Sequence, residues 1–417
     1  MKAMPDNSVD SIVTDPPYEL GFMGKSWDSS GIAFNIEVWQ EALRVLKPGG
    51  HLIAFSGSRT YHRMAVAIED AGFEIRDQIM WVYGSGFPKS HNISKAIDKA
   101  AGAEREVVQT IPDRWAGKGS VYQRSTQDET ETVEITQPST DAAKQWDGWG
   151  TALKPAHEPI VLARKPLVGT VANNVLTYGT GGLNIDGSRV GENFDKLQGR
   201  PIQKLATRLS DETDEEYRSR VLESPEQQLA LAKLKELGRW PANFIHDGSD
   251  EVVELFPDTK SGAVKPYQRA NRDSYSGSMP AESTFNKEGD SGSAARFFYC
   301  AKASKRDRNE GLDGFEAKFA PTMSDGIGGK EHNEETATKK LNHHPTVKPT
   351  DLMRYLVRLV TQPNGTVLDP FMGSGSTGKA CAYEGFDFIG IDQSAEYVEI
   401  ARARIEYAQK QEKDYLL

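Results

Sequence analysis

A glycine-rich segment near the C-terminus places the strongest constraint on the fold of this chain. Gly373, Gly375 and Gly378 follow a short apolar run at 366–369 and open a stretch with helical spacing, and Asp392 ends the next apolar run. Glycines so placed let the backbone approach a ligand, and an acid at the tip of the second strand can accept hydrogen bonds from ribose hydroxyls. The segment therefore predicts a Rossmann-like unit that binds a nucleotide-containing ligand.

The remaining pattern fits a doubly wound, mostly parallel α/β sheet. Apolar runs typical of strands lie at 9–13, 51–55, 75–83, 158–165 and 386–392. Helical spacing occurs at 36–47, 59–71, 395–410 and at 352–361, which residues 349–351 are expected to cap. Strands that alternate with helices indicate a parallel sheet with helices on its faces, and the run at 158–165 is expected to return to that sheet.

Composition divides the chain into a core and two other regions. The regular pattern occupies 1–84, a single strand within 156–166, and 342–417. Residues 85–155 are rich in Gly, Ser, Thr and charge, which predicts an insertion that is partly mobile. Residues 167–341 form a separate region of short apolar pieces with one charged helix at about 214–237.

Composition also narrows the class of protein. The chain has 417 residues, 37% of them hydrophobic and 26% charged, which is typical of a globular protein. Its two cysteines, Cys300 and Cys381, are too few and too far apart for a disulfide framework or a zinc site, and they indicate a reducing cytoplasm. Neither a signal peptide nor a run of about 18 apolar residues is present, so we expect neither export nor a membrane span.

The charge distribution leaves nucleic-acid binding open. The formal net charge is −10, which does not favour a phosphate backbone as partner. Basic residues nevertheless outnumber acidic ones between 264 and 308, and a local basic face there would suit phosphates. A solvated surface of mixed charge is the alternative.

A second motif, Asp15-Pro16-Pro17-Tyr18, follows the first apolar run of the chain. Two prolines lack backbone N–H groups and fix φ, so the segment is expected to leave the sheet as a rigid extended turn with its carbonyls outward. Ligands of open parallel sheets bind at the carboxyl ends of the strands, where this turn would lie. An ordinary surface turn is the alternative reading, because Asp-Pro is common in turns.

Together, the proline turn and the segment Asp369 to Thr377 resemble the two signature motifs of S-adenosylmethionine-dependent DNA amino-methyltransferases. The proline motif comes first, and the segment Asp369 to Thr377, which would be the loop that binds the methyl donor, comes last. This order is similar to that of the permuted β class, which includes stand-alone phage and prophage enzymes. His344 to Pro349 is similar to the family's motif just before the donor loop. The resemblance implies a circularly permuted class I methyltransferase fold with a target-recognition region at 167–341 and a second DNA-contacting arm at 85–155.

The resemblance also implies roles for individual residues. Catalysis would fall to Asp15, Pro16, Pro17 and Tyr18: the Asp15 side chain and the Pro16 carbonyl would accept the N–H groups of the target amine, and Tyr18 would stack on the flipped base. No metal and no covalent nucleophile is expected. The residues expected to bind S-adenosylmethionine are Asp369, Pro370, Phe371, Gly373, Ser374, Gly375, Ser376, Thr377, Asp392, Pro345, Thr346, Lys348 and Pro349.

The implied activity is methyl transfer to N6 of adenine in double-stranded DNA. Cytosine N4 is the second reading, although Asp at the first motif position favours adenine; a catalytically inactive DNA-binding relative and a nicotinamide oxidoreductase are less favoured. Lys302, Lys305 and Arg306 are candidate phosphate contacts within the basic stretch. The expected location is the cytoplasm of a bacterium or a phage-infected host, without membrane or obligate protein partners and with a homodimer left open.

Overall fold

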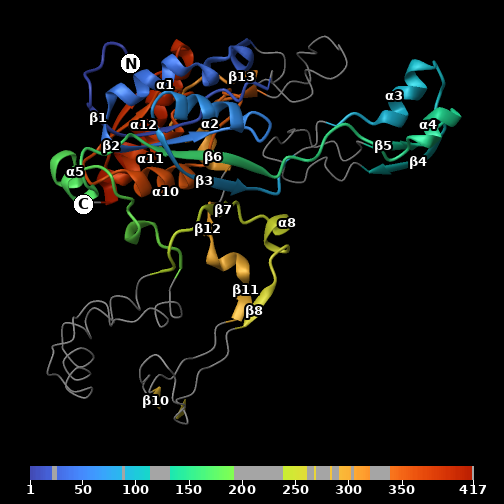
Figure 1. Cartoon of the computed structure of the whole chain (residues 1–417). Coiled ribbons are helices and arrows are strands. Elements are labelled where there is room, and N and C mark those ends of the chain that lie inside the picture. The colour runs from blue at the N-terminus through green and yellow to red at the C-terminus, as the bar shows by residue number, and fades with distance from the viewer. Residues whose placement is uncertain are drawn as a thin grey trace. The chain divides into compact units, whose positions relative to one another are not determined.

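The computed structural model of the chain describes residues 1–20, 26–86, 90–112, 132–191, 238–260, 267–268, 282–283, 291–301, 305–319 and 339–415. The chain divides into two compact units (Figure 1). The first comprises Met1–Ser188, Asn243–Asp247 and Ala301–Leu417, and the second comprises Arg189–Ala242 and Gly248–Cys300. Both motifs identified in the sequence belong to the first unit.

The first unit is built on a mostly parallel sheet. Its strands follow the order β7 (Phe244–His246), β3 (Glu74–Val82), β6 (His157–Arg164), β2 (Leu46–Phe55), β1 (Val9–Thr14), β15 (Thr366–Asp369) and β16 (Asp387–Gly390). β1 pairs in parallel with β2 and β15, whereas β6 runs antiparallel to both of its neighbours. The predicted α/β fold is confirmed, and the run predicted to return to the sheet is its antiparallel strand.

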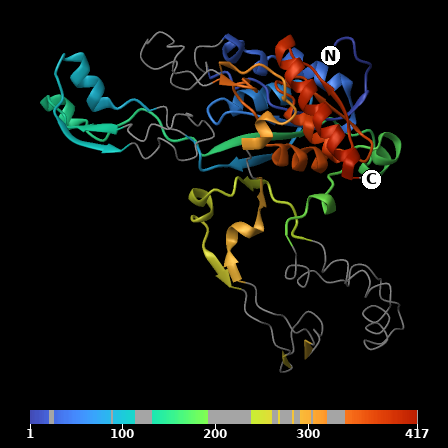
Figure 2. The ribbon, with the colours of Figure 1, turned by 180° about the vertical axis from the view of Figure 1, so that it is seen from behind.

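Helices cover both faces of this sheet. α1 (Ile36–Val45) and α2 (Tyr61–Asp70) lie on one face, and α10 (Thr350–Val360), α11 (Ser376–Glu384) and α12 (Ala395–Tyr415) lie on the other (Figures 1 and 2). The first face is packed around the fully buried Trp39, whose indole N–H donates to the Ala33 carbonyl over 2.9 Å.

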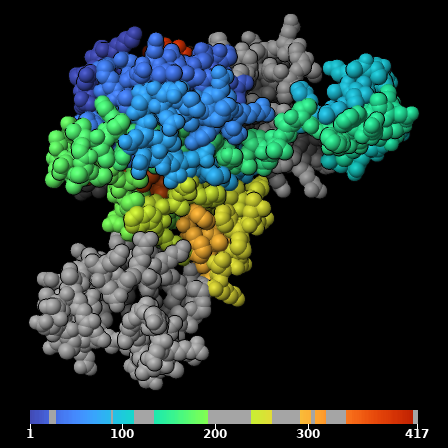
Figure 3. All heavy atoms as spheres, viewed as in Figure 1, coloured from blue at the N-terminus to red at the C-terminus, as the bar shows by residue number. Residues whose placement is uncertain are grey.

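Part of the region predicted to be separate belongs to the first unit. α5 (Val171–Tyr178) lies at the surface beside the elements of the first hundred residues (Figure 3). There the buried Asn174 side chain donates to the Pro48 carbonyl over 2.9 Å. The second compact unit is therefore smaller than the region that composition marks out.

The predicted insertion contains regular elements in its described part. These are α3 (Ile93–Ala100), β4 (Val107–Pro112), β5 (Thr132–Thr136), which is antiparallel to β4, and α4 (Asp141–Gln145). Asp98 joins them, because its buried carboxylate accepts hydrogen bonds from Arg105, Ser139 and Thr140. The Gly, Ser, Thr and charge content on which the predicted insertion rests does not report elements this short.

The second unit has short elements. They are α8 (Asp250–Val253), β8 (Asp258–Lys260) paired with β11 (Ser291–Ser293), β9 (Tyr267–Gln268) paired with β10 (Glu282–Ser283), the 3-10 helix Ala294–Phe297 and β12 (Tyr299–Cys300). The helix predicted at 214–237 lies outside the described residues.

The smaller elements of the first unit complete the description. They are the 3-10 helices Ser26–Ser29, Ile32–Phe34 and Asp186–Ser188, the helix α9 (Lys305–Asn309), and the strands β13 (Lys318–Phe319) and β14 (Lys339–Lys340), which pair with each other. No helix in the described part of the chain has the length and apolar character needed to cross a membrane.

Candidate active site

The proline turn and the glycine-rich segment meet at the carboxyl edge of the sheet. β1, which precedes the proline turn, lies beside β15, which precedes the glycines, with Ser11 opposite Val367. The Thr14 hydroxyl then donates to Asp369 Oδ1 over 2.6 Å. Two motifs separated by most of the chain therefore form one site.

Asp15, Tyr18, Glu158 and Lys348 form a polar cluster at this edge, in which Lys348 is buried and the other three are half-buried. The Lys348 ammonium donates to Asp15 Oδ2 over 2.7 Å and lies 3.4 Å from Glu158 Oε2. The Tyr18 hydroxyl donates to the same Glu158 oxygen over 2.8 Å. The ammonium also lies 5.3 Å from the centroid of the Tyr18 ring and 5.0 Å from that of Phe55. One cation thus balances two carboxylates beside two aromatic rings.

The surroundings fix the protonation states of this cluster. Burial alone would lower the pKa of Lys348, but the carboxylates of Asp15 and Glu158 outweigh it and raise that pKa above its ordinary value. Burial, followed by the same two carboxylates, raises the pKa of Tyr18 well above its ordinary range. At neutral pH Lys348 therefore remains an ammonium ion and Tyr18 a neutral phenol that can donate a hydrogen bond.

Asp15 keeps one acceptor atom unused. Oδ1 is buried and has no hydrogen-bond partner among the described residues, whereas Oδ2 accepts the Lys348 ammonium. An unsatisfied buried polar atom costs about 1–3 kcal/mol, and such atoms call for an explanation when a native structure retains them. Oδ1 is suited to accept an N–H group from a bound substrate.

Asp369 closes β15 and shapes the loop that follows. Its carboxylate accepts the Thr14 hydroxyl, the Phe371 backbone N–H over 3.1 Å and the Thr377 hydroxyl over 2.6 Å. Burial, only partly offset by these hydrogen bonds, raises the pKa of Asp369 to about 6. Asp369 was predicted to bind the methyl donor, and in the structure its carboxylate binds three groups of the protein itself.

Backbone conformation and close contacts explain why glycine occupies three positions of the loop. Gly373 and Gly375 have φ angles of 49° and 78°, which favour glycine. A Cβ atom would lie 2.7 Å from His344 Nε2 at Gly373, and 2.7 Å from the Ala401 Cβ of α12 at Gly375. A Cβ atom at Gly378 would lie 2.4 Å from Ile405 Cδ1. These glycines let α12 and His344 approach the loop closely.

Asp392 holds the opposite side of the loop. Its Oδ2 accepts the Gly373 backbone N–H over 2.9 Å, and its Oδ1 accepts the Ser394 backbone N–H over 2.8 Å. The side chain is half-buried, and each carboxylate oxygen retains a lone pair for a further donor. Asp392, which was predicted to accept ribose hydroxyls, thus also contacts the first glycine of the segment.

Six other predicted site residues lie in the segments just before α10 and just after β15. Pro345 is buried, Thr346 pairs through its carbonyl with the His344 ring, and Pro349 directly precedes α10. Lys348, which was grouped with them for donor binding, contacts Asp15 instead. Pro370 is buried, and the Phe371 ring centroid lies 6.5 Å from that of Trp39.

The predicted phosphate contacts are described only in part. Lys302 lies outside the described residues, and Lys305 and Arg306 begin α9, but of these two residues only the backbone is described. The next residue in the chain, Asp307, binds the Thr350 backbone at the start of α10. The end of the basic stretch therefore adjoins the glycine-loop side of the first unit.

Four residues of this site are not among those predicted from the sequence. They are Glu158, His344, Asp307 and Arg404. Each contacts a residue of one of the motifs or a residue that holds a motif in place. The available signal was a charged side chain within an apolar pattern: Glu158 lies in a strand that is otherwise apolar, and Arg404 lies on the buried side of the last helix. That signal shows that a partner exists but does not identify it.

We expect the His344 imidazole to remain neutral down to about pH 5. Burial is the largest influence and lowers the pKa of His344 to about 4, although the Thr346 carbonyl opposes it. Because the unfolded chain binds this proton near pH 6.5, the contribution of His344 to the free energy of unfolding is largest above that pH and is lost as the pH falls toward 4.

NMR can test this expectation directly. The imidazole proton resonance that disappears in a His344→Asn variant should keep one chemical shift between pH 5 and 8. A titration of that resonance with a midpoint near 6.5 would contradict the burial of the ring.

The fold and the site define a class of protein. The sheet is mostly parallel and is covered on both faces by helices. The glycine loop and its acid follow two adjacent strands, and the acidic proline turn lies beside them. This is a class I methyltransferase architecture. The chain belongs to the N6/N4 DNA methylase family, which matches residues 9–403. The family predicted from the two motifs is thereby confirmed.

Curated relatives match short parts of the chain. Among them, M2.DpnII, a type II methyltransferase of Streptococcus pneumoniae, is 40% identical over 88 residues, or 20% of this chain and 33% of that protein. M.HinfI, a type II methyltransferase of Haemophilus influenzae, is 36% identical over 77 residues, or 18% of this chain and 21% of that protein. The putative methylase YubD of Escherichia coli K12 is 41% identical over 68 residues, 16% of this chain and 30% of that protein. The chain spans a third or less of the length of these relatives.

Solved structures align over nearly the whole chain, with low TM-scores. The cytosine-N4-specific PvuII DNA methyltransferase aligns with 99% of this chain and 86% of its own, at 12% identity and a TM-score of 0.39. The M1.HpyAVI complex with SAM aligns with 97% of this chain and 90% of its own, at 16% identity and a TM-score of 0.36.

Proposed function

We propose that this chain is an S-adenosylmethionine-dependent DNA methyltransferase that methylates the N6 amine of adenine in duplex DNA by base flipping and direct displacement. Membership of the N6/N4 DNA methylase family supports the reaction class. The choice of adenine rests on the aspartate at the first position of the proline motif. The order of the two motifs supports assignment to the permuted β class.

The observation that carries this proposal is the free acceptor of Asp15. An exocyclic base amine is a weak nucleophile, because its lone pair is delocalised into the ring. Oδ1 of Asp15 is buried without a partner at the strand end that adjoins the glycine loop, and it can accept one amine N–H while the Pro16 carbonyl accepts the other. Both hydrogen bonds localise the lone pair on nitrogen and thereby activate it.

The other residues of the cluster position the target base. Tyr18 is fixed by its hydrogen bond to Glu158, so its ring is held ready to stack on a base that has left the duplex. Lys348 binds Oδ2 of Asp15 and so fixes the rotamer that presents Oδ1. Holding the amine in line for attack supplies much of the rate enhancement in a reaction of this kind.

The donor set around the loop fits S-adenosylmethionine. Asp392 retains acceptor capacity for ribose hydroxyls. When bound, S-adenosylmethionine supplies an electrophilic methyl group whose bond to sulfur breaks as the bond to the amine nitrogen forms. Asp369 and Thr377 serve the site by shaping the loop, since their side chains bind each other.

Cytosine N4 remains the second candidate, because the family includes both amines and Oδ1 of Asp15 can accept an N–H from either. Reading of the DNA sequence is proposed for the region 167–341, which contains the second compact unit. The insertion at 85–155 is the second proposed DNA contact, and Lys302, Lys305 and Arg306 are proposed to bind phosphates.

Nucleoside mass spectrometry tests the proposed reaction. DNA from methylation-deficient cells that express the protein should contain N6-methyladenine, and DNA from cells expressing the Asp15→Ala variant should not. N4-methylcytosine in its place would select the alternative base. Neither modified base in DNA from cells with abundant folded protein would contradict the proposal.

We expect Glu158→Gln to lower kcat by on the order of tenfold while leaving donor affinity unchanged. The substitution keeps the shape of the side chain but removes a charge, so the Lys348 ammonium is neutralised by Asp15 alone and weakens Asp15 as an acceptor. Steady-state kinetics and donor titration separate the two effects.

Glu74→Gln is the matched control for this prediction. Glu74 pairs with Arg164 over 2.6 Å near the other end of β6, so the same change of charge there should leave kcat as in the wild type. An equal loss of kcat in both variants would mean that Glu158 acts through stability alone.

A further inference from the structure

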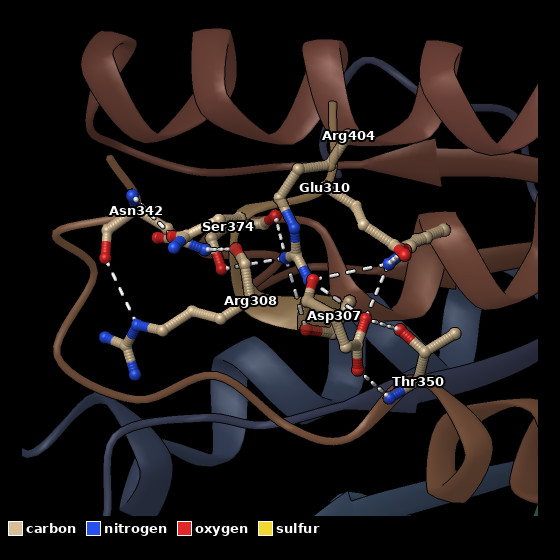
Figure 4. A network of polar contacts seen from close by, with 10 residues as sticks. Asp307, Arg308, Glu310, Asn342, Thr350, Ser374 and Arg404 are labelled. Atoms are coloured by element: carbon tan, nitrogen blue, oxygen red, sulfur yellow. Dashed lines mark hydrogen bonds and ion pairs between the residues drawn. The ribbon is translucent and has the colours of Figure 1, made fainter. Parts of the chain in front are cut away.

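Asp307 of α9 joins two helices that flank the glycine loop (Figure 4). Its carboxylate accepts hydrogen bonds from the Thr350 backbone N–H over 2.7 Å and from the Thr350 hydroxyl over 2.5 Å. The same carboxylate pairs with the Lys379 ammonium over 2.5 Å. Asp307 therefore caps the first turn of α10 and connects it to α11.

Arg404 of α12 extends this network to the loop itself. Its side chain is fully buried, and Nη1 donates to the Ser374 carbonyl over 2.6 Å and to the Ser374 hydroxyl over 3.1 Å. Nη2 donates to the Asp307 carbonyl over 3.2 Å. Because a guanidinium group is planar and rigid, Arg404 fixes the spacing between the loop and α9.

Arg308 supports the loop from a second direction. Its Nε donates to the Asn342 carbonyl over 3.2 Å, and its Nη2 donates to the His344 carbonyl. The His344 ring reaches Gly373, where Nε2 lies 2.7 Å from the position that a Cβ atom would take. Arg308 thereby holds the backbone of the residue that contacts the first glycine of the loop.

Stability alone does not account for this network. Lys379 is 1% exposed and Arg404 0%, and both are balanced by Asp307 and Glu310, whose side chains are 13% and 19% exposed. Taking such charges out of water costs several kcal/mol per ion, and apolar side chains of similar volume often stabilise a core equally well. What ion pairs and hydrogen bonds add is a defined position for each group that they join.

We propose that Asp307 and Arg308 form a clamp that holds the glycine loop in the shape required for the methyl donor. The inference rests on the proposed function, in which S-adenosylmethionine is the ligand of that loop. It assigns the end of the basic stretch to donor binding, whereas the sequence suggested phosphate contacts for this stretch. Both are positioning residues, because they reach the loop only through Arg404, α10, α11 and the His344 backbone.

The test compares Arg308 with an arginine outside the network. Arg308→Gln is expected to weaken binding of S-adenosylmethionine at least tenfold by isothermal titration, with affinity for duplex DNA in the absence of donor within twofold of the wild type. Arg402→Gln removes the same charge from the exposed side of α12 and should leave donor affinity unchanged. Wild-type donor affinity in Arg308→Gln, or a loss of DNA affinity alone, overturns the clamp.

Hydrogen exchange provides a readout that does not depend on ligand. Backbone amides at 373–377 should exchange faster in Arg308→Gln than in the wild type without donor, and unchanged exchange overturns the clamp. If Arg308→Gln does not fold, Arg308→Lys takes its place, because an ammonium group can bind one of the two carbonyls, and donor affinity should then fall less. If the wild-type protein binds no S-adenosylmethionine, the proposed function is contradicted. The hydrogen-exchange comparison still tests the clamp, because it is made without donor.

Discussion

Asp15→Ala is expected to lower kcat by on the order of 10³-fold or more while the affinity for S-adenosylmethionine stays within about threefold of the wild type. The variant loses the buried Oδ1, which is the acceptor proposed for the target amine. The glycine loop keeps its supports, since they come from Asp369, Asp392 and Arg404. Single-turnover kinetics and isothermal titration of the donor measure the two quantities separately.

Asp15→Asn is the companion to this variant. It retains an acceptor oxygen but cannot balance the Lys348 ammonium, so we expect its activity to lie between those of the alanine variant and the wild type. A parallel loss of donor affinity and of activity in Asp15→Ala would place Asp15 in the donor pocket or in the folding of the sheet edge.

Gly375→Val is expected to lower the free energy of unfolding by about 2–5 kcal/mol and to abolish donor binding. A valine at φ 78° is strained, and its Cβ atom would lie 2.7 Å from the Ala401 Cβ and 2.9 Å from the Ala401 Cα. Since Ala401 belongs to a long helix packed against α11, the loop must move instead, and Ser374 moves with it. Thermal unfolding and donor titration measure both effects.

Substitutions at two other glycines separate the cost of backbone strain from the cost of steric crowding. Gly31 has a φ of 74° with nothing within 4 Å of a Cβ atom, so Gly31→Ala should show the backbone cost alone, about 1–2 kcal/mol. Gly182 has open space and no positive φ, and Gly182→Ala should be nearly neutral. Loss of donor binding in Gly375→Val with wild-type stability would mean that the side chain meets the ligand and not α12.

The parts of the site that the sequence predicts are those with local causes. An apolar run followed by prolines, and another followed by glycines, specify where two strands end, whatever the rest of the chain does. The position of Asp392 at the end of the next strand also follows, because strand, loop, helix and strand are consecutive there. Local pattern therefore predicts the fold class, the loop and its acid.

The parts that the sequence does not predict depend on contacts between distant segments. Residues 349–351 suggest a local cap for α10, yet Pro349 makes no side-chain cap and Asp307 accepts the Thr350 N–H instead. The partner of Lys348 could not be read from its motif either, because Asp15 lies at the other end of the chain. No local periodicity records such pairings, since each depends on the finished sheet bringing two strand ends together.

The position of β1 between β2 and β15 has a consequence for synthesis of the protein. Thr14 binds Asp369, which is added 355 residues later. At about 5–20 residues per second, a ribosome needs on the order of 20–70 s to supply that partner. Until then one edge of β1 lacks its strand, and open edges invite pairing with other chains. The edge that carries Asp15 is therefore among the last parts of the molecule to form, and slowed translation should reduce the yield of folded protein.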